Sequence, residues 1–373
     1  MSHFSLVCTR CAQAHSPSMT TLGCGSCGAP LDVLYESTPD ANQSRVVPPM
    51  PFHAESPPIS LGEGNTPIVP LDATGRTLGL RDLKAKLEYL NPTGSFKDRG
   101  TATMMSVAAE LGVDAVAEDS SGNAGASVAA YAARAGIEAH IFAPASAPQA
   151  KMQQIGVYGA HTHAIEGPRE AATEAAVAFC RENSLVYASH NLSPSFLEGT
   201  KTFAYEIASQ MAGALPDHVV IPVGNGSLFI GAWKGFHGLV AAGVLDRAPK
   251  LHAIQAEAVM PVAAAFAGRE WTPQPGAATI AGGIAVGDPP RKQQVLDVLR
   301  ASGGVSIAVA EAAIASWHAR LANTEGIYCE PTSAAAFAGL ELLIEAGHVA
   351  SHDSVLVAVT GFGLKDAPPT NNR

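Results

Sequence analysis

The sequence predicts an α/β protein with two lobes and a small N-terminal ribbon, and three observations predict it. From about residue 99 onwards, short apolar runs alternate with segments of helical periodicity, which is typical of parallel sheets with crossover helices. This alternation falls into two blocks, the second beginning at about residue 198, which indicates two lobes. Ahead of both blocks, four cysteines form two Cys-x-x-Cys pairs, the pattern of a metal-binding ribbon.

The ribbon prediction rests on the spacing of Cys8, Cys11, Cys24 and Cys27, whose two pairs are separated by twelve residues. Four thiolates at this spacing can surround one zinc ion tetrahedrally, and such a closed shell serves structure rather than catalysis. The alternatives are a ribbon that folds without metal, or a redox pair. We assign the ribbon to residues 1–36 and an extended linker, rich in Pro, Ser and Asn, to residues 37–58.

In the first α/β block, the expected strands and helices alternate strictly. The expected strands are 115–118, 139–143, 162–165 and 185–188, and the expected helices are 101–111, 124–134, 147–154 and 168–182. Because ligands of such sheets bind beyond the carboxyl ends of the strands, the glycine-rich loops that follow the strands are the candidate sites.

The second block continues the pattern with a looser stretch in its middle. The expected strands are 218–222, 251–255 and 354–359, and the expected helices are 198–211, 227–240, 291–301, 311–323 and 332–346. Again a glycine-rich loop follows a strand, at residues 223–226.

The bulk composition excludes several classes of protein. The 373 residues are 47% apolar and 15% charged, which allows sizeable cores, and the net charge is −10. A nucleic-acid surface needs clustered Lys and Arg, so nucleic acid is not an expected partner. No apolar run reaches the length of about 18 residues that a transmembrane helix needs, so no membrane partner is expected either. Residues 1–10 do not resemble a secretory signal, and we expect the cytoplasm.

Lys97 is the leading candidate for a catalytic residue. Residues 91–100 read Asn-Pro-Thr-Gly-Ser-Phe-Lys-Asp-Arg-Gly, which places this lysine between a glycine-containing turn and the start of an apolar helix. A lysine there can leave water and hold a carbonyl cofactor as a Schiff base. Taken alone, such a residue is more often an ordinary surface lysine, and the surrounding ten residues reverse that interpretation.

Two glycine-containing loops offer backbone N–H groups to anions. Residues 120–127, Ser-Ser-Gly-Asn-Ala-Gly-Ala-Ser, join a strand to a helix, and the helix N-terminus favours an anion such as a substrate carboxylate. An N-cap with a tight turn is the plainer interpretation. Residues 222–231 form a second strand–loop–helix junction, whose glycines let amides gather around a phosphate.

The chain resembles a known family in five ordered segments. The segment around Lys97 is similar to the pyridoxal-phosphate (PLP) lysine motif of threonine synthases. Residues 61–67, Leu-Gly-Glu-Gly-Asn-Thr-Pro, and 359–366, Val-Thr-Gly-Phe-Gly-Leu-Lys-Asp, also resemble that family, which belongs to the fold type II PLP enzymes of the tryptophan synthase β-like superfamily. The resemblance implies a two-lobed, three-layer fold, a homodimer, a large PLP domain of residues 59–100 and 198–373, and a small α/β domain of residues 101–197.

The resemblance also implies roles for individual residues. Lys97 would hold PLP and act as the catalytic base, Asn123 would bond to the phenolic oxygen of PLP, and the hydroxyl of Thr360 would meet its pyridine nitrogen. A neutral hydroxyl there makes the ring a weaker electron sink, which suits elimination and replacement. The implied phosphate-binding residues are Val223, Gly224, Asn225, Gly226 and Ser227. The implied substrate-binding residues are Ser120, Ser121, Gly122, Asn123, Ala124 and Phe196.

Three departures from the threonine synthase pattern favour a substrate without a side-chain phosphate. The family commonly has an arginine shortly before its Glu-Gly-x-Lys-Thr segment, whereas this chain has Phe196 there. An aromatic ring cannot replace a cation that binds phosphate in two-pronged fashion. Ala124 stands where a threonine is common, and residues 224–231 are closer to the loop of serine and threonine dehydratases. Arg169, His161, His163 or His190 could recognise a different group, or could be ordinary polar residues.

The sequence therefore predicts a PLP-dependent carbon–oxygen or carbon–nitrogen lyase acting on an amino acid. We expect it to eliminate a Cβ substituent from an unphosphorylated amino acid and to release a keto acid and ammonia. The alternatives are threonine synthase proper, which converts O-phosphohomoserine and water to threonine and phosphate, or a related β/γ-replacement enzyme. Two further alternatives, a non-catalytic ribbon protein that binds nucleic acid or a partner, and a sensor that binds the cofactor without turnover, stay open at this point.

Overall fold

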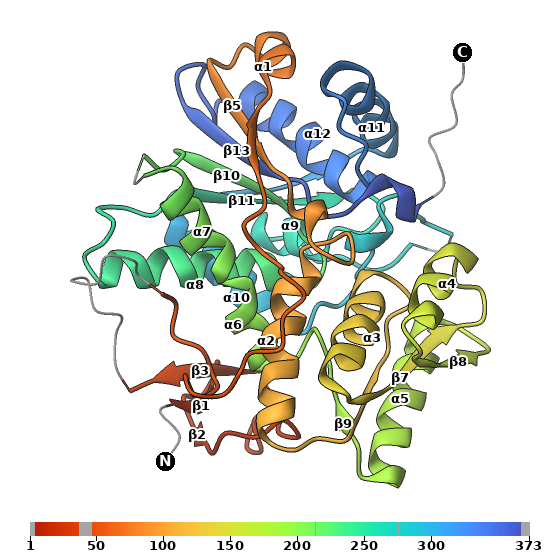
Figure 1. Cartoon of the computed structure of the whole chain (residues 1–373). Coiled ribbons are helices and arrows are strands. Elements are labelled where there is room, and N and C mark those ends of the chain that lie inside the picture. The colour runs from red at the N-terminus through yellow and green to blue at the C-terminus, as the bar shows by residue number, and fades with distance from the viewer. Residues whose placement is uncertain (1–3, 37–46, 213, 275, 367–373) are drawn as a thin grey trace. The chain divides into compact units, whose positions relative to one another are not determined.

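The computed structural model describes residues 4–36, 47–212, 214–274 and 276–366, and the chain divides into two compact units (Figure 1). The first unit comprises Met1–Glu63 and Asn91–Thr202, and the second comprises Gly64–Leu90 and Phe203–Arg373. These units group the ribbon and residues 91–100 with the expected small domain. The domain division expected from the sequence stays a prediction, and residues 37–46 of the expected linker lie outside the described residues.

The second unit is built on a six-stranded sheet with the order β12-β11-β10-β13-β5-β4. Its strands are β4 Ile68–Pro70, β5 Asp82–Lys86, β10 His218–Pro222, β11 Lys250–Ala256, β12 Ser306–Val309 and β13 Ser354–Ala358. Neighbouring strands are parallel, except that β4 runs antiparallel to β5 at the edge. Parallel strands of this kind carry apolar runs, and β10 and β13 are accordingly buried almost throughout.

Helices pack against this sheet. They are α1 Asp72–Leu78, α7 Thr202–Gln210, α8 Ser227–Ala241, α9 Pro261–Phe266, α10 Lys292–Ser302, α11 Glu311–Glu325 and α12 Pro331–Glu345, with short 3₁₀ turns at Glu88–Leu90, Gly282–Ile284 and Gly363–Lys365. Helix α12 approaches the sheet closely at Gly339, where a Cβ atom would lie 2.5 Å from Ile254 Cδ1 of β11. Glycine at this position therefore lets the helix backbone lie directly on the sheet.

The first unit contains a parallel four-stranded sheet with the order β8-β7-β6-β9. Its strands are β6 Ala115–Glu118, β7 Glu138–Pro144, β8 His161–Ile165 and β9 Val186–Tyr187, and its helices are α2 Lys97–Glu110, α3 Asn123–Ala135, α4 Gln149–Val157, α5 Arg169–Asn183 and α6 Pro194–Thr200. Figure 1 shows β7 and β8 with α4 and α5 beside them. The strict alternation of strands and helices is as the sequence predicted.

The N-terminal residues form a small antiparallel sheet with the order β2-β1-β3. Its strands are β1 Phe4–Cys8, β2 Ala14–His15 and β3 Leu31–Tyr35. Leu6 and Leu31 are buried together with Cys8 and Cys24 in a small hydrophobic cluster of their own. The mixed α/β fold with an N-terminal cysteine cluster is the fold class that the sequence predicted. In the described residues, no helix combines the length and the apolar character needed to span a membrane.

The single helix expected over residues 198–211 is wrong. Two helices, α6 and α7, meet there at Lys201, and α6 begins earlier, with the Ser193 side chain accepting a hydrogen bond from the Phe196 N–H at 3.4 Å. At the junction, Thr200 Oγ1 donates to the Leu197 carbonyl at 2.8 Å and Thr202 Oγ1 donates to the Gly199 carbonyl at 2.7 Å. Such side-chain bonds to backbone carbonyls compete with helical hydrogen bonds and bend helices.

Strand β5 escaped the sequence analysis because it carries charged residues. Lys86 is a strand residue whose side chain is fully buried. Its amine donates to the Thr66 carbonyl at 2.6 Å and to Gln210 Oε1 at 2.8 Å, and it also pairs with Glu206. A buried ammonium is tolerated only with such partners, and these come from distant parts of the sequence.

A chain of hydrogen bonds crosses the sheet of the second unit through two buried histidines. The Val305 N–H donates to His252 Nδ1 at 3.3 Å, so the His252 proton lies on Nε2 and is donated to His218 Nδ1 at 2.9 Å. His218 Nε2 then donates to Asp353 Oδ2 at 3.1 Å. Burial lowers the pKa of His252 to about 3, and the charges of His218, His348 and Lys250 act in the same direction.

We expect the free energy of unfolding to fall as the pH drops from 6.5 towards 3. The folded protein keeps His252 neutral in this range while the unfolded chain takes up a proton, so stability present above pH 6.5 is lost below it, by as much as about 4 kcal/mol. Urea unfolding at several pH values measures this loss. The His252→Gln variant should show a flatter pH dependence than the wild type, whereas His161→Gln, at an exposed histidine, should not. Equal slopes in all three proteins would contradict the assignment.

Candidate active site

Lys97 is the first residue of α2, where the chain leaves a tight turn. Gly94 has a φ of +87°, which a side chain would strain, and its N–H donates to the Asn91 carbonyl at 2.8 Å. Lys97 is half-buried, and its Nζ lies 4.8 Å from the ring centre of Phe96 and 5.8 Å from that of Phe196. Aromatic faces hold an ammonium group while shielding it from water.

Asp98 fixes the turn that presents Lys97. This fully buried carboxylate accepts hydrogen bonds from Thr93 N at 2.7 Å, Thr93 Oγ1 at 2.6 Å and Ser127 Oγ at 2.7 Å. The turn before Lys97 is thereby tied to α3. No role for Asp98 is predicted from the sequence, although an acidic residue beside the lysine in the first turn of a helix is an available signal.

The loop between β6 and α3 wraps tightly over the start of its helix. The Gly122 N–H donates to Ser120 Oγ at 3.2 Å, and no side chain caps the helix at Gly122. A Cβ atom on Gly125 would lie 1.9 Å from the Ser120 carbonyl oxygen, so only glycine fits there. Ser120 and Ala124 are buried, while Ser121 and Asn123 are half-buried. Helix N-termini favour anions, and a carboxylate site at the start of α3 stays a prediction.

A buried acid–imidazole cluster lies at the carboxyl end of β6. His190 Nδ1 bonds to Glu118 Oε1, and these two residues and Asp119 offer ligand atoms that all lie within 4.8 Å of one another. Burial raises the pKa of Glu118 well above its ordinary value, and burial together with the charges of Lys97 and Arg169 lowers the pKa of His190 well below its own. Both shifts favour the neutral forms of the two side chains.

The other polar residues considered for substrate recognition lie elsewhere in the first unit. Arg169 is partly exposed, and its Nη2 lies 3.6 Å from Asp119 Oδ2. His161 and His163 stand on β8 and neighbour His140 of β7, with His163 Nε2 3.1 Å from His140 Nδ1. Of the four, only His190 packs beside Phe196, with 6.2 Å between ring centres.

Phe196 is a fully buried residue of α6 that packs on the first turn of α2. A Cβ atom on Gly100 would lie 2.6 Å from the Phe196 ring, so the missing side chain at Gly100 makes room for the ring. The position that was predicted to lack the phosphate-binding arginine therefore holds an aromatic ring close to the Lys97 amine.

The second unit carries the second glycine-rich loop, between β10 and α8. Gly226 has a φ of +84° and caps α8 without a side-chain hydrogen bond, and a Cβ atom there would lie 2.4 Å from Val295 Cγ2. A Cβ atom on Gly224 would lie 3.0 Å from the Gly283 carbonyl oxygen. Gln255 is fully buried and stabilises the loop, because its Nε2 donates to the Val223 carbonyl at 3.1 Å.

Thr360, at the end of β13, is positioned by Ser333, a partner that the sequence analysis did not identify. The Ser333 hydroxyl oxygen accepts from the Thr360 N–H at 2.9 Å and from the Gly361 N–H at 3.2 Å. With both acceptor positions used, Ser333 donates its proton to Thr360 Oγ1, 3.2 Å away. The hydroxyl proton of Thr360 is then left to be donated to another acceptor.

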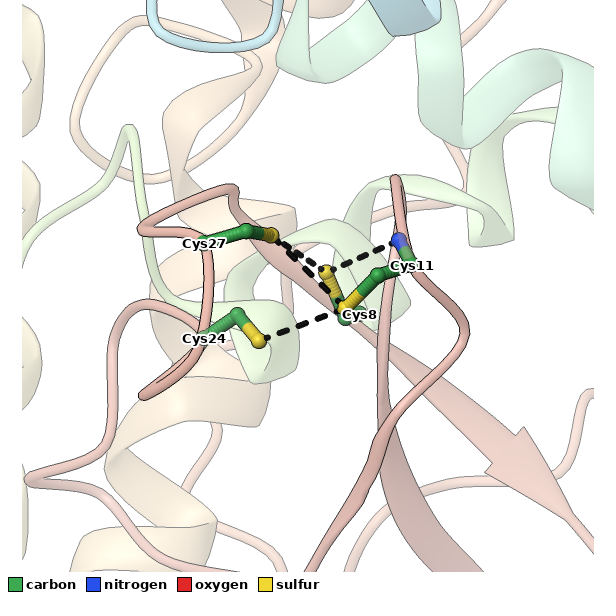
Figure 2. Close-up of side chains that lie close together, drawn as sticks. All are labelled: Cys8, Cys11, Cys24 and Cys27. Carbon is green, nitrogen blue, oxygen red and sulfur yellow. Dashed lines mark hydrogen bonds between the residues drawn. The ribbon is translucent and has the colours of Figure 1, made fainter.

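The four predicted metal-binding cysteines lie together (Figure 2). Cys8 Sγ lies 3.4 Å from Cys27 Sγ, and Cys11 Sγ lies 3.6 Å from Cys24 Sγ. A tetrahedral zinc ion with Zn–S bonds of about 2.3 Å places its sulfurs about 3.8 Å apart, so the cluster suits one such ion. The Ser26 N–H is the main cause that lowers the pKa of Cys24 to about 6, and the Cys11 N–H likewise lowers the pKa of Cys8. Against the lowering effect of the Gln13 backbone, the neighbouring thiols raise the pKa of Cys11 to about 12. Thiolates are the form that binds metal.

Comparison with known proteins identifies the class. Residues 59–361 match the family described as pyridoxal-phosphate dependent enzyme, and the chain belongs to this family. The chain is 35% identical to a threonine synthase from Methanocaldococcus jannaschii over 96% of this chain and 92% of that protein. It is 33% identical to a threonine synthase from Methanosarcina acetivorans over 97% and 92%, respectively.

Solved structures agree on the fold. A fungal L-serine ammonia-lyase from Rhizomucor miehei superposes with a TM-score of 0.71 at 22% identity, covering 80% of this chain and 94% of that chain. Threonine deaminase isoform 2 from Solanum lycopersicum gives a TM-score of 0.68 at 21% identity, covering 89% and 94%. The expectations of a fold type II, PLP-dependent lyase resembling threonine synthases are confirmed.

The residues present fit PLP. The amine of Lys97 is of the kind that can bond to its aldehyde, and the loop at Gly224 and Gly226, at the N-terminus of α8, is of the kind that can hold its phosphate. The Asn225 Oδ1 atom is buried and has no hydrogen-bond partner among the described residues, which leaves a polar end for a ligand. Thr360 supplies a neutral hydroxyl that can donate to the pyridine nitrogen.

Proposed function

We propose that this enzyme eliminates a Cβ substituent from an amino acid that carries no side-chain phosphate, releasing a keto acid and ammonia. The observation that carries the proposal is the burial of Phe196 against Gly100, 5.8 Å from Lys97 Nζ. An apolar ring cannot satisfy a phosphate dianion, whose desolvation needs charged or multiple hydrogen-bonding partners. The position therefore favours a small, uncharged substituent.

In the proposed reaction, Lys97 would hold the cofactor until the amino group of the substrate displaces it, and the freed Nζ would then remove the Cα proton of the substrate. When bound, PLP would supply a sink for the electron pair that this proton leaves behind. The N–H groups at the start of α3 hold the substrate carboxylate, with Ser120, Ser121, Gly122, Asn123 and Ala124 as the proposed substrate-binding loop. Asp98 orients Lys97 through Thr93, and the rings of Phe96 and Phe196 keep water from its amine.

Further residues are proposed for the other cofactor contacts. Val223, Gly224, Asn225, Gly226 and Ser227 would hold the phosphate of PLP, and Asn123 of the first unit would hold its phenolic oxygen. Thr360 would donate its hydroxyl proton to the pyridine nitrogen, because Ser333 already supplies a proton to Thr360 Oγ1. A pyridine nitrogen that accepts a hydrogen bond but carries no full proton makes the ring a weaker electron sink. A weaker electron sink suits elimination.

Threonine synthase proper is the second candidate, and the identity of 35% over 96% of this chain to a protein of that name favours it. It requires a phosphate-binding group other than the residue at position 196. A β/γ-replacement enzyme would use the same residues with a different acceptor.

A substrate panel separates these candidates. The purified holoenzyme is titrated with threonine, serine, diaminopropionate, cysteate and O-phosphohomoserine, and its visible spectrum, keto acid, ammonia, threonine and phosphate are measured. Keto acid and ammonia from an unphosphorylated amino acid support elimination. Threonine and phosphate from O-phosphohomoserine alone would overturn it in favour of the second candidate.

We also propose that Cys8, Cys11, Cys24 and Cys27 hold one structural zinc ion. We expect metal analysis of the purified protein to find about one zinc per chain, because four thiolates satisfy its tetrahedral shell. The Cys24→Ser variant should lose the metal, whereas Cys180→Ala, at a cysteine outside the cluster, should keep it. Intact cysteines without zinc in protein purified under reducing conditions would contradict the proposal.

A further inference from the structure

The ribbon ends in a residue that reaches α6. Tyr35 is the last residue of β3, and its hydroxyl donates to Glu198 Oε2 at 2.7 Å. Its ring lies 4.4 Å from the amine of Lys201, which also donates to the Tyr35 hydroxyl at 3.3 Å. The ribbon is therefore joined by a phenol to both ends of one ion pair.

That ion pair is buried. The side chains of Glu198 and Lys201 are 0% and 5% exposed, and the Lys201 amine bonds directly to the Glu198 carboxylate. A buried charge costs several kcal/mol unless its partners satisfy it, so the orientation of this carboxylate depends on each donor it has. The phenol of Tyr35 is one of these donors, and it is supplied by the ribbon rather than by α6 itself.

Helix α6 packs closely against the first turn of α2. A Cβ atom on Gly199 would lie 2.0 Å from the Arg99 carbonyl oxygen, and one on Gly100 would lie 2.6 Å from the Phe196 ring. Arg99 also donates from Nη1 to Thr202 Oγ1 at 3.1 Å. Because the backbones of α6 and α2 touch at these glycines, a displacement of Glu198 is passed to the turn that carries Lys97.

We propose that Tyr35 is a positioning residue for the active site, and that the ribbon acts through Glu198 and α6 to fix Phe196 and Lys97. This inference rests on the proposed role of Lys97 but not on which amino acid is the substrate. In this proposal the ribbon holds α6 in place beside the Lys97 amine. It therefore serves the enzyme itself and does not bind nucleic acid.

The test uses the Tyr35→Phe holoenzyme, which keeps the ring beside Lys201 and removes only the hydroxyl. We expect hydrogen–deuterium exchange to rise in peptides covering residues 97–110 and 194–202. We also expect the visible absorbance of bound PLP to shift and kcat to fall by about tenfold with little change in KM, the factor expected from losing one hydrogen bond to a buried charged group. Thr20→Val, which removes an exposed hydroxyl near the ribbon turns, is the matched control and should change none of these.

Two results would overturn the proposal. One is faster exchange confined to the ribbon, with residues 194–202 unchanged. The other is faster exchange at α6 while kcat and the PLP spectrum of the variant equal those of the wild type. The contact would then stabilise the fold without positioning the active site. A second variant, Glu198→Gln, guards against a folding defect. Its effect on kcat should not add to that of Tyr35→Phe in the double variant, and additive effects would contradict a shared route. If Lys97→Ala keeps the PLP spectrum and turnover, the proposed function fails instead, independently of these results.

Discussion

Replacing Lys97 with alanine is expected to abolish both turnover and the visible absorbance of covalently bound PLP. The substitution removes the amine that would bond to the cofactor and that would accept the Cα proton. Loss of a positioned base alone lowers rates by about 10²–10⁴-fold, and loss of the covalent attachment adds to this. Lys97 is half-buried at the first position of α2, and its amine lies over two aromatic rings without being part of the core. We therefore expect folding to survive.

The measurement combines absorbance, steady-state kinetics and thermal unfolding of the Lys97→Ala protein. Addition of a small primary amine such as methylamine should restore a fraction of the turnover, because the cavity left by the side chain admits a free base. Lys292→Ala, at a partly exposed lysine of α10, is the control and should behave as the wild type. Turnover by the Lys97→Ala variant within a factor of about ten of the wild type would remove the basis of the proposed mechanism.

The second large effect is expected from Gly125→Ala. A Cβ atom at this position would lie 1.9 Å from the Ser120 carbonyl oxygen and 3.2 Å from Ile141 Cγ2. The first of these contacts is with backbone, which cannot rotate away, so either α3 or the loop before it must move. We expect a loss of at least about 3 kcal/mol in the free energy of unfolding, in the range of severe overpacking. Substrate binding should also suffer, because the displaced loop is the proposed carboxylate site.

Urea unfolding and substrate titration of the Gly125→Ala variant measure these effects. Gly156→Ala is the matched control in the same unit. Its Cβ atom meets nothing within 4 Å, so it should be neutral or slightly stabilising, by up to about 1 kcal/mol through helix propensity. A wild-type unfolding curve and wild-type KM for Gly125→Ala would mean that the Ser120 carbonyl is not where the structure has it.

The sequence was most informative where local chemistry alone decides the structure. Strands β6 and β10 begin and end at the expected residues, because each is an apolar run that leads into a glycine-containing loop and a helix. The lysine turn and the four cysteines were found for the same reason, since each motif is contiguous or evenly spaced. Apolar periodicity and glycine are signals that a single segment carries by itself.

What the sequence could not supply were the contacts between distant segments. The Glu118–His190 pair joins residues 72 positions apart, and Ser333 supports Thr360 from 27 positions away. Strand β5 was missed because Lys86 is charged, and its burial is acceptable because Thr66, Glu206 and Gln210 bond to its amine. The break between α6 and α7 depends on two threonine hydroxyls that bond to backbone carbonyls of the helix. The spacing of apolar residues does not predict such bonds.

The burial of Lys86 has a practical consequence for finding the reactive lysine by chemical proteomics. Lys86 and Lys97 lie close in the sequence, but the Lys86 side chain is fully enclosed and bonded to three partners, while Lys97 is half-buried. A borohydride treatment that fixes the cofactor on its lysine should thus mark Lys97 alone. Trypsin would still cut after Lys86 and Arg99 but not after the blocked Lys97, so the label would appear on one peptide spanning residues 87–99.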